Sequence, residues 1–504
     1  MSFVILTYPN EILIYIYVIS NPNTFLLTGG VSGIASNQTT IGKTTIIISK
    51  EDLASQNIKN MLLEIRNWVP IDIDCPSVIS AFEFKMFRMV EIEGMHIYQE
   101  GLDRRLEECG LDSDIIIFAS RHRSKDGRQI LTVHPTGNTK EAKLGGNPME
   151  LASTSPQTIR SIYMNLKTLS KNEDFQASIE STHHGPSGLK TPSVFVEIGS
   201  TEKEWVDPLA GRIVANAILM LGNEDVPVAV GFGGNHYAPR QTKLMEDIEM
   251  TFGHIFPTYK LDELDETLIK QAFERSCADF AYLDRKSMSA KQRNRLTSII
   301  EGLGYEVLRE SDIREMDGVP WELCKVLRKK MNDLCPSGRA RITEGIKCEF
   351  KNACLECVCP KVKVTKISPE LLREAEKLDR PRLKEFLAAH SIAYLEHKNG
   401  QFSHILIGID DDCARLVAEE LTNECINILK EHYDIRYHKD EGTLYLITKK
   451  FSPELARKLG ITSGPTFGAL ARGETVSVGN KKVSPDMVYE TNVKTIKVHT
   501  IYRD

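Results

Sequence analysis

The stretch that decides the fold is residues 207–231, which read DPLAGRIVANAILMLGNEDVPVAVG. Asp207 followed by Pro208 predicts a helix start, because aspartate caps free backbone N–H groups and proline fits the first turn. Apolar residues then recur at helical spacing until Gly222, namely Leu209, Ile213, Ala217 and Leu221. Val226–Gly231 follows as a short β-prone run. A helix followed at once by a buried strand is the repeating unit of an α/β protein.

The same alternation is found nearer the N-terminus. Thr45–Ser49 is a β-branched run suited to a buried strand, and a helix is predicted from Ala54 to Trp68. Asp114–Ala119 is another short apolar run, typical of a strand covered on both faces. We therefore predict an α/β sheet with helices on both sides, formed by residues 45–310.

Length and composition indicate a multidomain globular protein. The chain has 504 residues, of which 41% are hydrophobic and 26% charged, with a net charge of −6. This length is too great for one core, so we expect two or three domains. The acidic balance argues against a protein coated in basic surface, although a local basic face is compatible with nucleic-acid contact. Eleven cysteines at irregular spacing favour a reducing, cytoplasmic location over a disulfide framework.

Residues 1–44 are predicted to lie outside the fold. Ile12–Ile19 is an apolar run of eight residues, too short to cross a bilayer, and residues 1–12 contain no Lys or Arg for a secretory signal. Gly42-Lys43-Thr44 resembles the end of a phosphate-binding loop, but Asn37 stands where the loop needs glycine. We expect neither a membrane anchor nor a nucleoside triphosphate site.

Residues 311–504 are predicted to form a separate α+β region, either as one module or as two, 311–450 and 451–504. Ser368-Pro369 predicts a helix start, and strands are predicted at Ile405–Ile409 and Leu444–Thr448. Five cysteines cluster irregularly, namely Cys335, Cys348, Cys354, Cys357 and Cys359. Two alternatives stay open for this cluster, a structural metal site or reduced cysteines that pack.

Histidines concentrate in the middle of the chain. Six of the thirteen lie between residues 122 and 254, namely His122, His134, His183, His184, His236 and His254. Histidines or glutamates follow four of the predicted strands directly. They are His134, Glu180, Glu197 and the Gly233–His236 stretch, each of which comes after a β-prone run. Ligands of open α/β sheets bind outside the carboxyl ends of the strands. We therefore expect one site at that edge, built from residues 120–260.

Five blocks hold these residues in a fixed order. They are Ser120–Arg123, Leu131–Asn138, Thr182–Pro186, Glu197–Glu202 with Trp205, and Gly233–Arg240. Their order and spacing resemble the D-aminoacyl-tRNA deacylases of the archaeal and plant type, over about half of the chain. The resemblance implies hydrolysis of the ester that joins a D-amino acid to tRNA, zinc dependence, and a mixed central sheet like that of nucleoside phosphorylases and peptidyl-tRNA hydrolases.

Roles can be assigned to the His and Glu residues as hypotheses. Zinc with an open coordination position polarises a carbonyl and lowers the pKa of bound water. Candidate ligands are His134, His183, Glu197 and His236, with His184 and Glu180 as acid–base groups. Neighbouring side chains point to opposite sides of an extended chain, so we expect only one of His183 and His184 to bind metal. The alternatives are a packed histidine in this pair and a structural salt bridge for Glu197.

Residues around the predicted centre would contact the substrate. Free N–H groups of Gly233 and Gly234 could form an oxyanion hole. We expect contacts with the substrate from four further side chains, namely Asn138, Asn235, Tyr237 and Arg240. Tyr237 suits stacking on the terminal adenine and Arg240 suits pairing with a phosphate, unless Arg240 only begins a solvated helix.

The predicted partner is D-aminoacyl-tRNA, bound by a monomer or homodimer. The run Leu459–Pro465 with Gly468 and Arg472-Gly473 is similar to a segment in tRNA 3′-end processing nucleases, which makes tRNA binding by the C-terminal region a hypothesis. Two other functions stay open. One is a peptidase-like or nucleoside-processing hydrolase on the same fold, and the other is a non-catalytic tRNA-binding protein.

Overall fold

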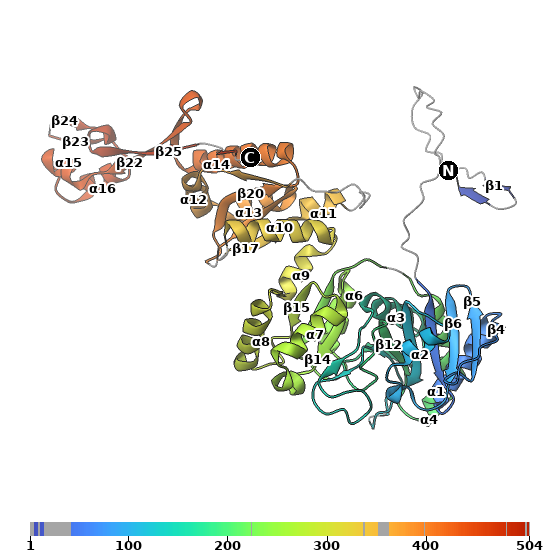
Figure 1. Ribbon diagram of the computed structural model, residues 1–504. Coiled ribbons are helices and arrows are strands. Elements are labelled where there is room, and N and C mark those ends of the chain that lie inside the picture. Colours follow the sequence, from blue (N-terminus) through green and yellow to red (C-terminus); the bar gives the residue numbers. More distant parts are fainter. Residues whose placement is uncertain are drawn as a thin grey trace. The chain divides into compact units, whose positions relative to one another are not determined.

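The computed structural model in Figure 1 describes residues 5–8, 11–14, 42–125, 127–222, 224–335, 338–350, 362–397, 399–479, 481–498 and 501–502. The chain divides into a unit of residues 1–40 and a unit of residues 41–504. In the first unit, β1 (Ile5–Tyr8) pairs antiparallel with β2 (Glu11–Ile14). All other elements belong to the second unit.

A mixed eight-stranded sheet forms the centre of the second unit. Its strands, in spatial order, are β11 (Gln176–Ile179), β8 (Ile130–His134), β12 (Ser193–Gly199), β7 (Ile115–Arg121), β3 (Thr44–Ser49), β6 (Phe87–Ile92), β5 (Ser80–Phe84) and β4 (Val69–Ile71). The four strands from β12 to β6 are parallel to one another, whereas β8 runs antiparallel to β12. The predicted mixed α/β sheet is confirmed.

Side chains from the two faces of this sheet enter different cores. Ile46 and Ile48 of β3 pack in one core with α1 (Leu53–Ile65), α3 (Pro156–Leu169) and α5 (Pro208–Leu219). Ile47 packs on the opposite face with Phe195 and α2 (Leu102–Glu108). Successive strand residues point to opposite faces, so this separation is the direct result of an unbroken apolar run.

The stretch that decided the prediction folds as expected. The Asp207 side chain accepts a hydrogen bond from Leu209 N and caps α5, with Pro208 at its first position. The strand predicted after it is β13 (Val228–Phe232). The predicted helix from Ala54 to Trp68 ends earlier, at Ile65, because Arg66 is extended and the Trp68 indole donates to Leu62 O.

A second, fully parallel sheet lies beyond α5 in the sequence. Its strands, in spatial order, are β14 (Thr251–Phe256), β13, β15 (Phe280–Leu283) and β16 (Glu306–Leu308). The helices that accompany it are α6 (Pro239–Asp247), α7 (Glu266–Ser276) and α8 (Ala290–Gly302), whereas the short α4 (Glu202–Trp205) packs against α1, α5 and β12 of the first sheet. The loop after β13 carries the predicted Gly-Gly-Asn-His sequence.

Residues from 310 onward form an α+β region, as predicted. Its helices are α9 (Glu310–Met316), α10 (Trp321–Leu334), α11 (Glu344–Phe350), α12 (Pro369–Leu378), α13 (Arg380–Ala389) and α14 (Asp411–His432). Its first sheet is β17 (Arg339–Ile342), β19 (Ile392–Glu396), β20 (Phe402–Gly408), β18 (Lys363–Lys366) and β26 (Ile501–Tyr502). The domain boundaries themselves stay predictions.

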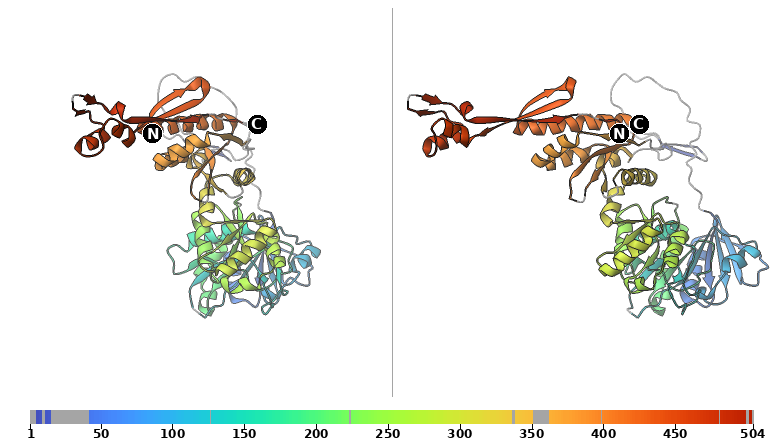
Figure 2. Two further views of the ribbon diagram at one scale, coloured as in Figure 1. Left: turned by 90° about the vertical axis from the view of Figure 1, so that its left-hand side faces the viewer. Right: turned by 60° about the vertical axis from the view of Figure 1, so that its left-hand side comes forward.

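A second sheet of this region is a long ribbon. It consists of β21 (Asp434–His438), β22 (Thr443–Phe451) and β25 (Tyr489–Lys497). Between β22 and β25 come α15 (Pro453–Lys458), α16 (Pro465–Ala471), β23 (Val476–Val478) and β24 (Lys481–Val483). Both views of Figure 2 show this red ribbon and the small unit at its end.

The cysteines need one correction. Cys75 and Cys109 form a disulfide, so the expectation of reduced thiols is wrong for this pair. Cys109 packs against the core that contains Ile47 and Phe195, and its partner Cys75 is 34 residues away in sequence. Cys354, Cys357 and Cys359 lie outside the described residues, and the metal hypothesis for their cluster stays a prediction. Within the described ranges, no helix combines the length and the apolar character needed to cross a membrane.

Candidate active site

The candidate site lies on one face of the eight-stranded sheet, around Glu197 in β12. Strand pairing places Glu197 beside Thr132 of β8 and Ser120 of β7, and Phe195 beside His134. Paired residues, and residues two apart along a strand, point to the same face of a sheet. Glu197 and His134 therefore share the face whose core contains Phe195.

The expectation that the strands deliver these residues to a common carboxyl edge is wrong. β7 runs parallel to β12, whereas β8 runs antiparallel to it, so the ends of β7 and β8 lie at opposite edges. Glu180 follows β11, which is parallel to β8, and its N–H donates to Val133 O. Side chains from both edges therefore reach inward over the sheet face to meet at Glu197.

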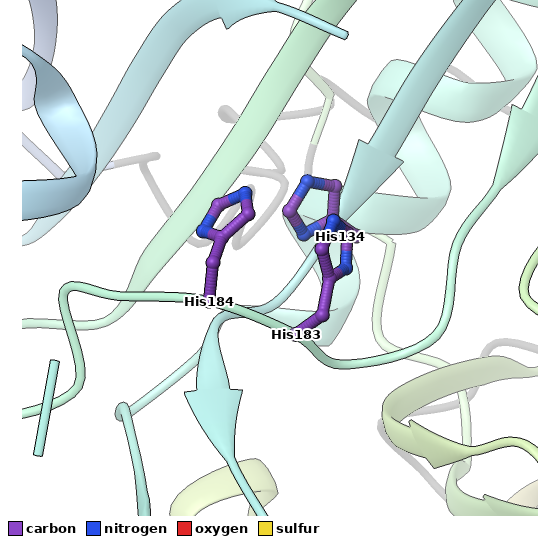
Figure 3. Close-up of side chains that lie close together, drawn as sticks. All are labelled: His134, His183 and His184. Atoms are coloured by element: carbon purple, nitrogen blue, oxygen red, sulfur yellow. The ribbon is translucent and has the colours of Figure 1, made fainter. Parts of the chain in front are cut away.

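Three histidines gather at this place, as Figure 3 shows. The ring centroids of His134 and His183 are 4.3 Å apart, those of His183 and His184 4.4 Å, and those of His134 and His184 5.0 Å. Each Nδ1 lies 2.7–3.1 Å from a backbone carbonyl oxygen, of Pro135, Ser181 and Gly185 respectively. A carbonyl can only accept, so Nδ1 carries the proton and each Nε2 has a free lone pair.

Both members of the His183-His184 pair turn towards His134, which corrects the expectation that they point to opposite sides. The expectation assumed an extended chain, but His184 has φ +45°, in the left-handed region that few residues other than glycine adopt. This turn cancels the alternation of side chains. It is held by Gly137 N donating to His184 O and by Gly185 N donating to Leu144 O. A backbone outlier at a cluster of polar side chains is typical of a functional site.

Two buried carboxylates face the histidines. Glu197 Oε1 lies 3.7 Å from His134 Nε2 and 3.9 Å from His184 Nε2, and Glu180 Oε2 lies 3.6 Å from His183 Nε2. Burial acts to raise the pKa of Glu197, but polar contacts with the neighbouring histidines outweigh it and hold that pKa well below its ordinary value. Glu197 is therefore an anion within an almost dry cluster.

The other pKa values follow from the same arrangement. Burial opposes ionisation of Glu180, yet its contacts with His236 and His122 lower the pKa overall. Burial also opposes protonation of His134, but the Glu197 carboxylate outweighs it and raises the pKa. The pKa of His183 is well below its ordinary value, because burial and the surrounding histidines act in the same direction. His183 is therefore a neutral ring with a free nitrogen.

Two more histidines complete the cluster from the outer side. His236 Nε2 lies 3.2 Å from Glu180 Oε2, and its side chain is 30% exposed. His122 Nδ1 lies 3.0 Å from Glu180 Oε1 and 3.4 Å from Glu197 Oε2, so it stands between the two carboxylates. No role was assigned to His122 from the sequence. The sequence does contain an indication of such a role, because His122 lies two residues after Ser120 and therefore points to the same face of the sheet as Ser120 and Glu197.

The donor atoms fit a metal ion. His134 Nε2 and both oxygens of Glu180 are buried, and among the described residues they have close ionisable neighbours but no hydrogen bond of regular geometry. Three groups each bring three ligand atoms within 4.8 Å, namely His134–His183–His184, Glu180–His183–His236 and His122–Glu180–Glu197. Imidazole nitrogen and carboxylate oxygen are the ligands that zinc and other borderline cations prefer. The predicted ligands His134, His183, Glu197 and His236 all belong to this cluster, and so does His184.

The chain is similar to known proteins of one family. Residues 109–308 match the model of a family described as D-aminoacyl-tRNA deacylase. A protein of Methanococcoides burtonii called D-aminoacyl-tRNA deacylase is 40% identical over 462 residues, which cover 90% of this chain and 96% of that protein. The chain belongs to the D-aminoacyl-tRNA deacylase family. The family is one of hydrolases.

Relatives of this family occur in two lengths. A Methanoculleus marisnigri protein of the same name is 34% identical over 91% of this chain and 99% of its own length. The Methanosarcina acetivorans protein is 52% identical, but its 282 matched residues are 95% of that protein and only 55% of this chain. Some relatives therefore match nearly the whole chain, and others match little more than half of it.

A solved structure supports the fold of the same part. A crystal structure of a conserved protein of unknown function is 38% identical, with a TM-score of 0.51, over 54% of this chain and 96% of that one. A nucleosidase of Campylobacter jejuni aligns over 36% of this chain, with 12% identity and a TM-score of 0.25.

The backbone N–H groups of Gly233 and Gly234 already donate hydrogen bonds within the protein, so the prediction that they form an oxyanion hole needs correction. Gly233 N donates to Phe256 O and Gly234 N donates to Ser287 Oγ. The glycines serve the turn instead, since their φ angles are +96° and +88°. A Cβ on Gly233 would lie 2.6 Å from Ser287 Oγ.

The predicted substrate-binding residues divide into two kinds. Tyr237 reaches the cluster, with its hydroxyl 3.2 Å from His122 Nε2 and Arg128 over its ring. Asn235 lies in the same loop, where its side chain accepts from Tyr237 N. Asn138 instead donates to backbone carbonyls of its own loop, and Arg240 is paired with Asp284 at 3.0 Å. Their predicted contacts with substrate stay predictions.

His254 belongs to the histidine-rich segment but not to the cluster. It is fully buried, with Nε2 3.0 Å from Ala152 O and Nδ1 3.0 Å from Thr182 Oγ1. Burial lowers its pKa to about 4. This neutral histidine anchors the start of the loop that carries His183 and His184.

Proposed function

We propose that this chain hydrolyses the ester of D-aminoacyl-tRNA with the help of bound zinc, releasing a free D-amino acid and tRNA. The observation that carries the proposal is the group of three histidine Nε2 atoms beside two buried carboxylates, in a chain of the deacylase family. An aminoacyl ester is already activated. Its hydrolysis needs a positioned water, a proton acceptor and stabilisation of negative charge on the carbonyl oxygen.

His134, His183 and His184 are the proposed zinc ligands. Their Nδ1 protons are fixed by backbone carbonyls, which leaves the Nε2 lone pairs available, and the three histidines can bring ligand atoms within 4.8 Å of one another. When bound there, zinc would supply Lewis acidity towards the ester carbonyl. Glu197, buried beside His134 and His184, would balance the charge of the ion. Compared with the predicted ligands, His184 joins the set, whereas Glu197 balances the charge and His236 stands next to Glu180.

Glu180 and His236 are the proposed acid–base pair. Glu180 is held as an anion, so it can take a proton from the water that attacks the ester carbonyl carbon. The bond between that carbon and the ribose oxygen then breaks, and the ribose oxygen takes a proton from His236. His236 lies 3.2 Å from Glu180 and is partly exposed, so it can pass protons between the cluster and the bound ribose. His122, between both glutamates, positions them.

The first test separates chirality, metal and residue roles. D-Tyr-tRNA and L-Tyr-tRNA are incubated with the purified protein, with and without a chelator, and the remaining ester is measured. We expect rapid loss of the D-ester only, which the chelator abolishes and added zinc restores. Loss of the D-ester after complete metal removal would reject the zinc mechanism. Cleavage of free amino esters or nucleosides without preference for tRNA would favour the rival hydrolase function, and binding without cleavage the non-catalytic one.

A variant pair tests the ligands independently of activity. His183→Ala should lower the bound zinc, measured by mass spectrometry of the purified protein. His438→Ala is the matched control, because His438 is exposed in β21, outside the cluster. Equal zinc content in both variants would remove His183 from the ligand set.

A further inference from the structure

Residues 443–498, here called the ribbon module, form a small unit mounted on two paired strands. β22 and β25 pair antiparallel over all nine residues of each. Residues 452–488 lie between them and have their own hydrophobic core of Ala456, Ile461, Leu470, Val476, Val483 and Val488. Ser452 N donates to Val488 O at the base of this core. The unit is therefore an insertion into a β-hairpin whose two ends are in contact.

The ribbon module is basic in an acidic protein. It contains nine Lys or Arg and four Asp or Glu, a net charge of +5, so the rest of the chain carries −11. All nine cations are exposed. Within the described residues, five of them have no ion pair, namely Lys450, Arg457, Lys481, Lys482 and Lys497, of which Lys497 donates to the Thr443 hydroxyl. This positive charge is left unneutralised by the protein, so it can act on a polyanion within about 10 Å of the surface.

The composition of the module suits binding and not chemistry. It contains no histidine and no cysteine, the side chains that most often ligate metals or act as nucleophiles near neutral pH. A relative of the same family matches only 282 residues of this chain, and these cover 95% of its own length. A second function added to an unchanged catalytic part is most simply a contact with the same substrate.

We propose that the ribbon module binds the phosphodiester backbone of tRNA, as a contact surface additional to the catalytic cluster. The proposal rests on the proposed function for its choice of tRNA as the polyanion. Lys and Arg that neutralise phosphates release counterions, which makes binding strong at low salt and independent of sequence. The long ribbon presents these cations on exposed strands, since β25 is exposed along almost its whole length.

The test measures binding of uncharged tRNA to the full-length protein by fluorescence anisotropy at several salt concentrations. The binding variant carries Lys450→Gln, Arg457→Gln, Lys481→Gln and Lys482→Gln together. The control variant carries four exposed lysines outside the module changed in the same way, namely Lys171, Lys291, Lys329 and Lys330. Both variants lose the same charge, so a general effect of net charge would appear in both.

We expect the binding variant to raise the Kd at low salt by roughly tenfold or more, and to reduce the slope of log Kd against log salt by about 3. The control variant should match the wild type. A second variant replaces residues 453–487 by Asn-Gly, which can close the hairpin because Ser452 and Val488 are already hydrogen-bonded. Its affinity should fall as well, with kcat unchanged at saturating substrate.

The two proposals can fail separately. Wild-type affinity and salt slope in both module variants would overturn the ribbon-module proposal, even if deacylation proceeds normally. Loss of tRNA affinity in a protein that cleaves no ester would support the module and reject the deacylase function. Binding to vesicles of phosphatidylserine with no binding to tRNA would overturn the proposal in favour of a membrane surface.

Discussion

The buried His254 should make the catalytic part sensitive to mild acid. Its folded-state pKa is about 4, against an ordinary value of 6.5. In the unfolded chain the ring takes up a proton as the pH falls below 6.5, whereas in the folded chain it stays neutral. The stability due to the depressed pKa is therefore complete above 6.5 and is lost between 6.5 and 4.

The size of the effect follows from this difference. Between about pH 7.5 and pH 5, the linkage relation gives a loss of about 2 kcal/mol for this one group. His254→Gln cannot titrate in this range, so it should lack this part of the pH dependence. Its hydrogen bonds to Thr182 and Ala152 would be imperfectly replaced, at a cost of about 1–2 kcal/mol at neutral pH.

Hydrogen exchange of the β14 amides is the suitable assay, because it reports the opening free energy of that strand and not of the whole chain. Exchange is measured at both pH values in wild type and variant, after correction for the intrinsic rates. Other titrating groups affect both proteins equally and cancel in the comparison. The reasoning is refuted if both proteins lose the same free energy between the two pH values.

Three further changes have clear expectations. Gly233→Ala should destabilise the protein by about 3 kcal/mol in thermal unfolding, because the new methyl group would clash with Ser287 and alanine disfavours the backbone φ of +96° at this position. Gly302→Ala is the control and should be neutral, because a methyl group there would meet open space. Glu197→Gln should lower zinc affinity and kcat by about 10- to 100-fold, measured by metal titration and initial rates, and unchanged values would show a purely structural role. Changing Cys75 and Cys109 to serine should cost about 3–4 kcal/mol in denaturant unfolding, because the bond closes a loop of 34 residues, and equal stability would mean that the thiols are not linked.

The sequence was sufficient for the elements and for the members of the site. Local signals such as the Asp207-Pro208 cap act within a few residues, so they survive into the structure unchanged. Four of the histidines in the cluster and both glutamates can be predicted as site residues, because polar side chains next to buried strands cost free energy unless they are paired or serve a function.

The geometry of the site could not be predicted in the same way. Whether β8 runs parallel or antiparallel to β12 depends on pairing between distant segments, and no local pattern records it. The left-handed turn at His184 breaks the alternation on which the reasoning about the His pair relied. The Gly233 and Gly234 amides donate hydrogen bonds to Phe256 and Ser287. These acceptors are too far away in sequence for a local pattern to indicate them.

The histidines of the cluster have a consequence for how such a site can change during evolution. His134, His183 and His184 are oriented by main-chain carbonyls and not by neighbouring side chains. Every amino acid supplies the same carbonyl, so substitutions at Pro135, Ser181 or Gly185 leave the acceptor atom in place as long as the backbone path is kept. The orientation of the rings is thus inherited with the loop, and the surrounding side chains are free to adapt to new substrates.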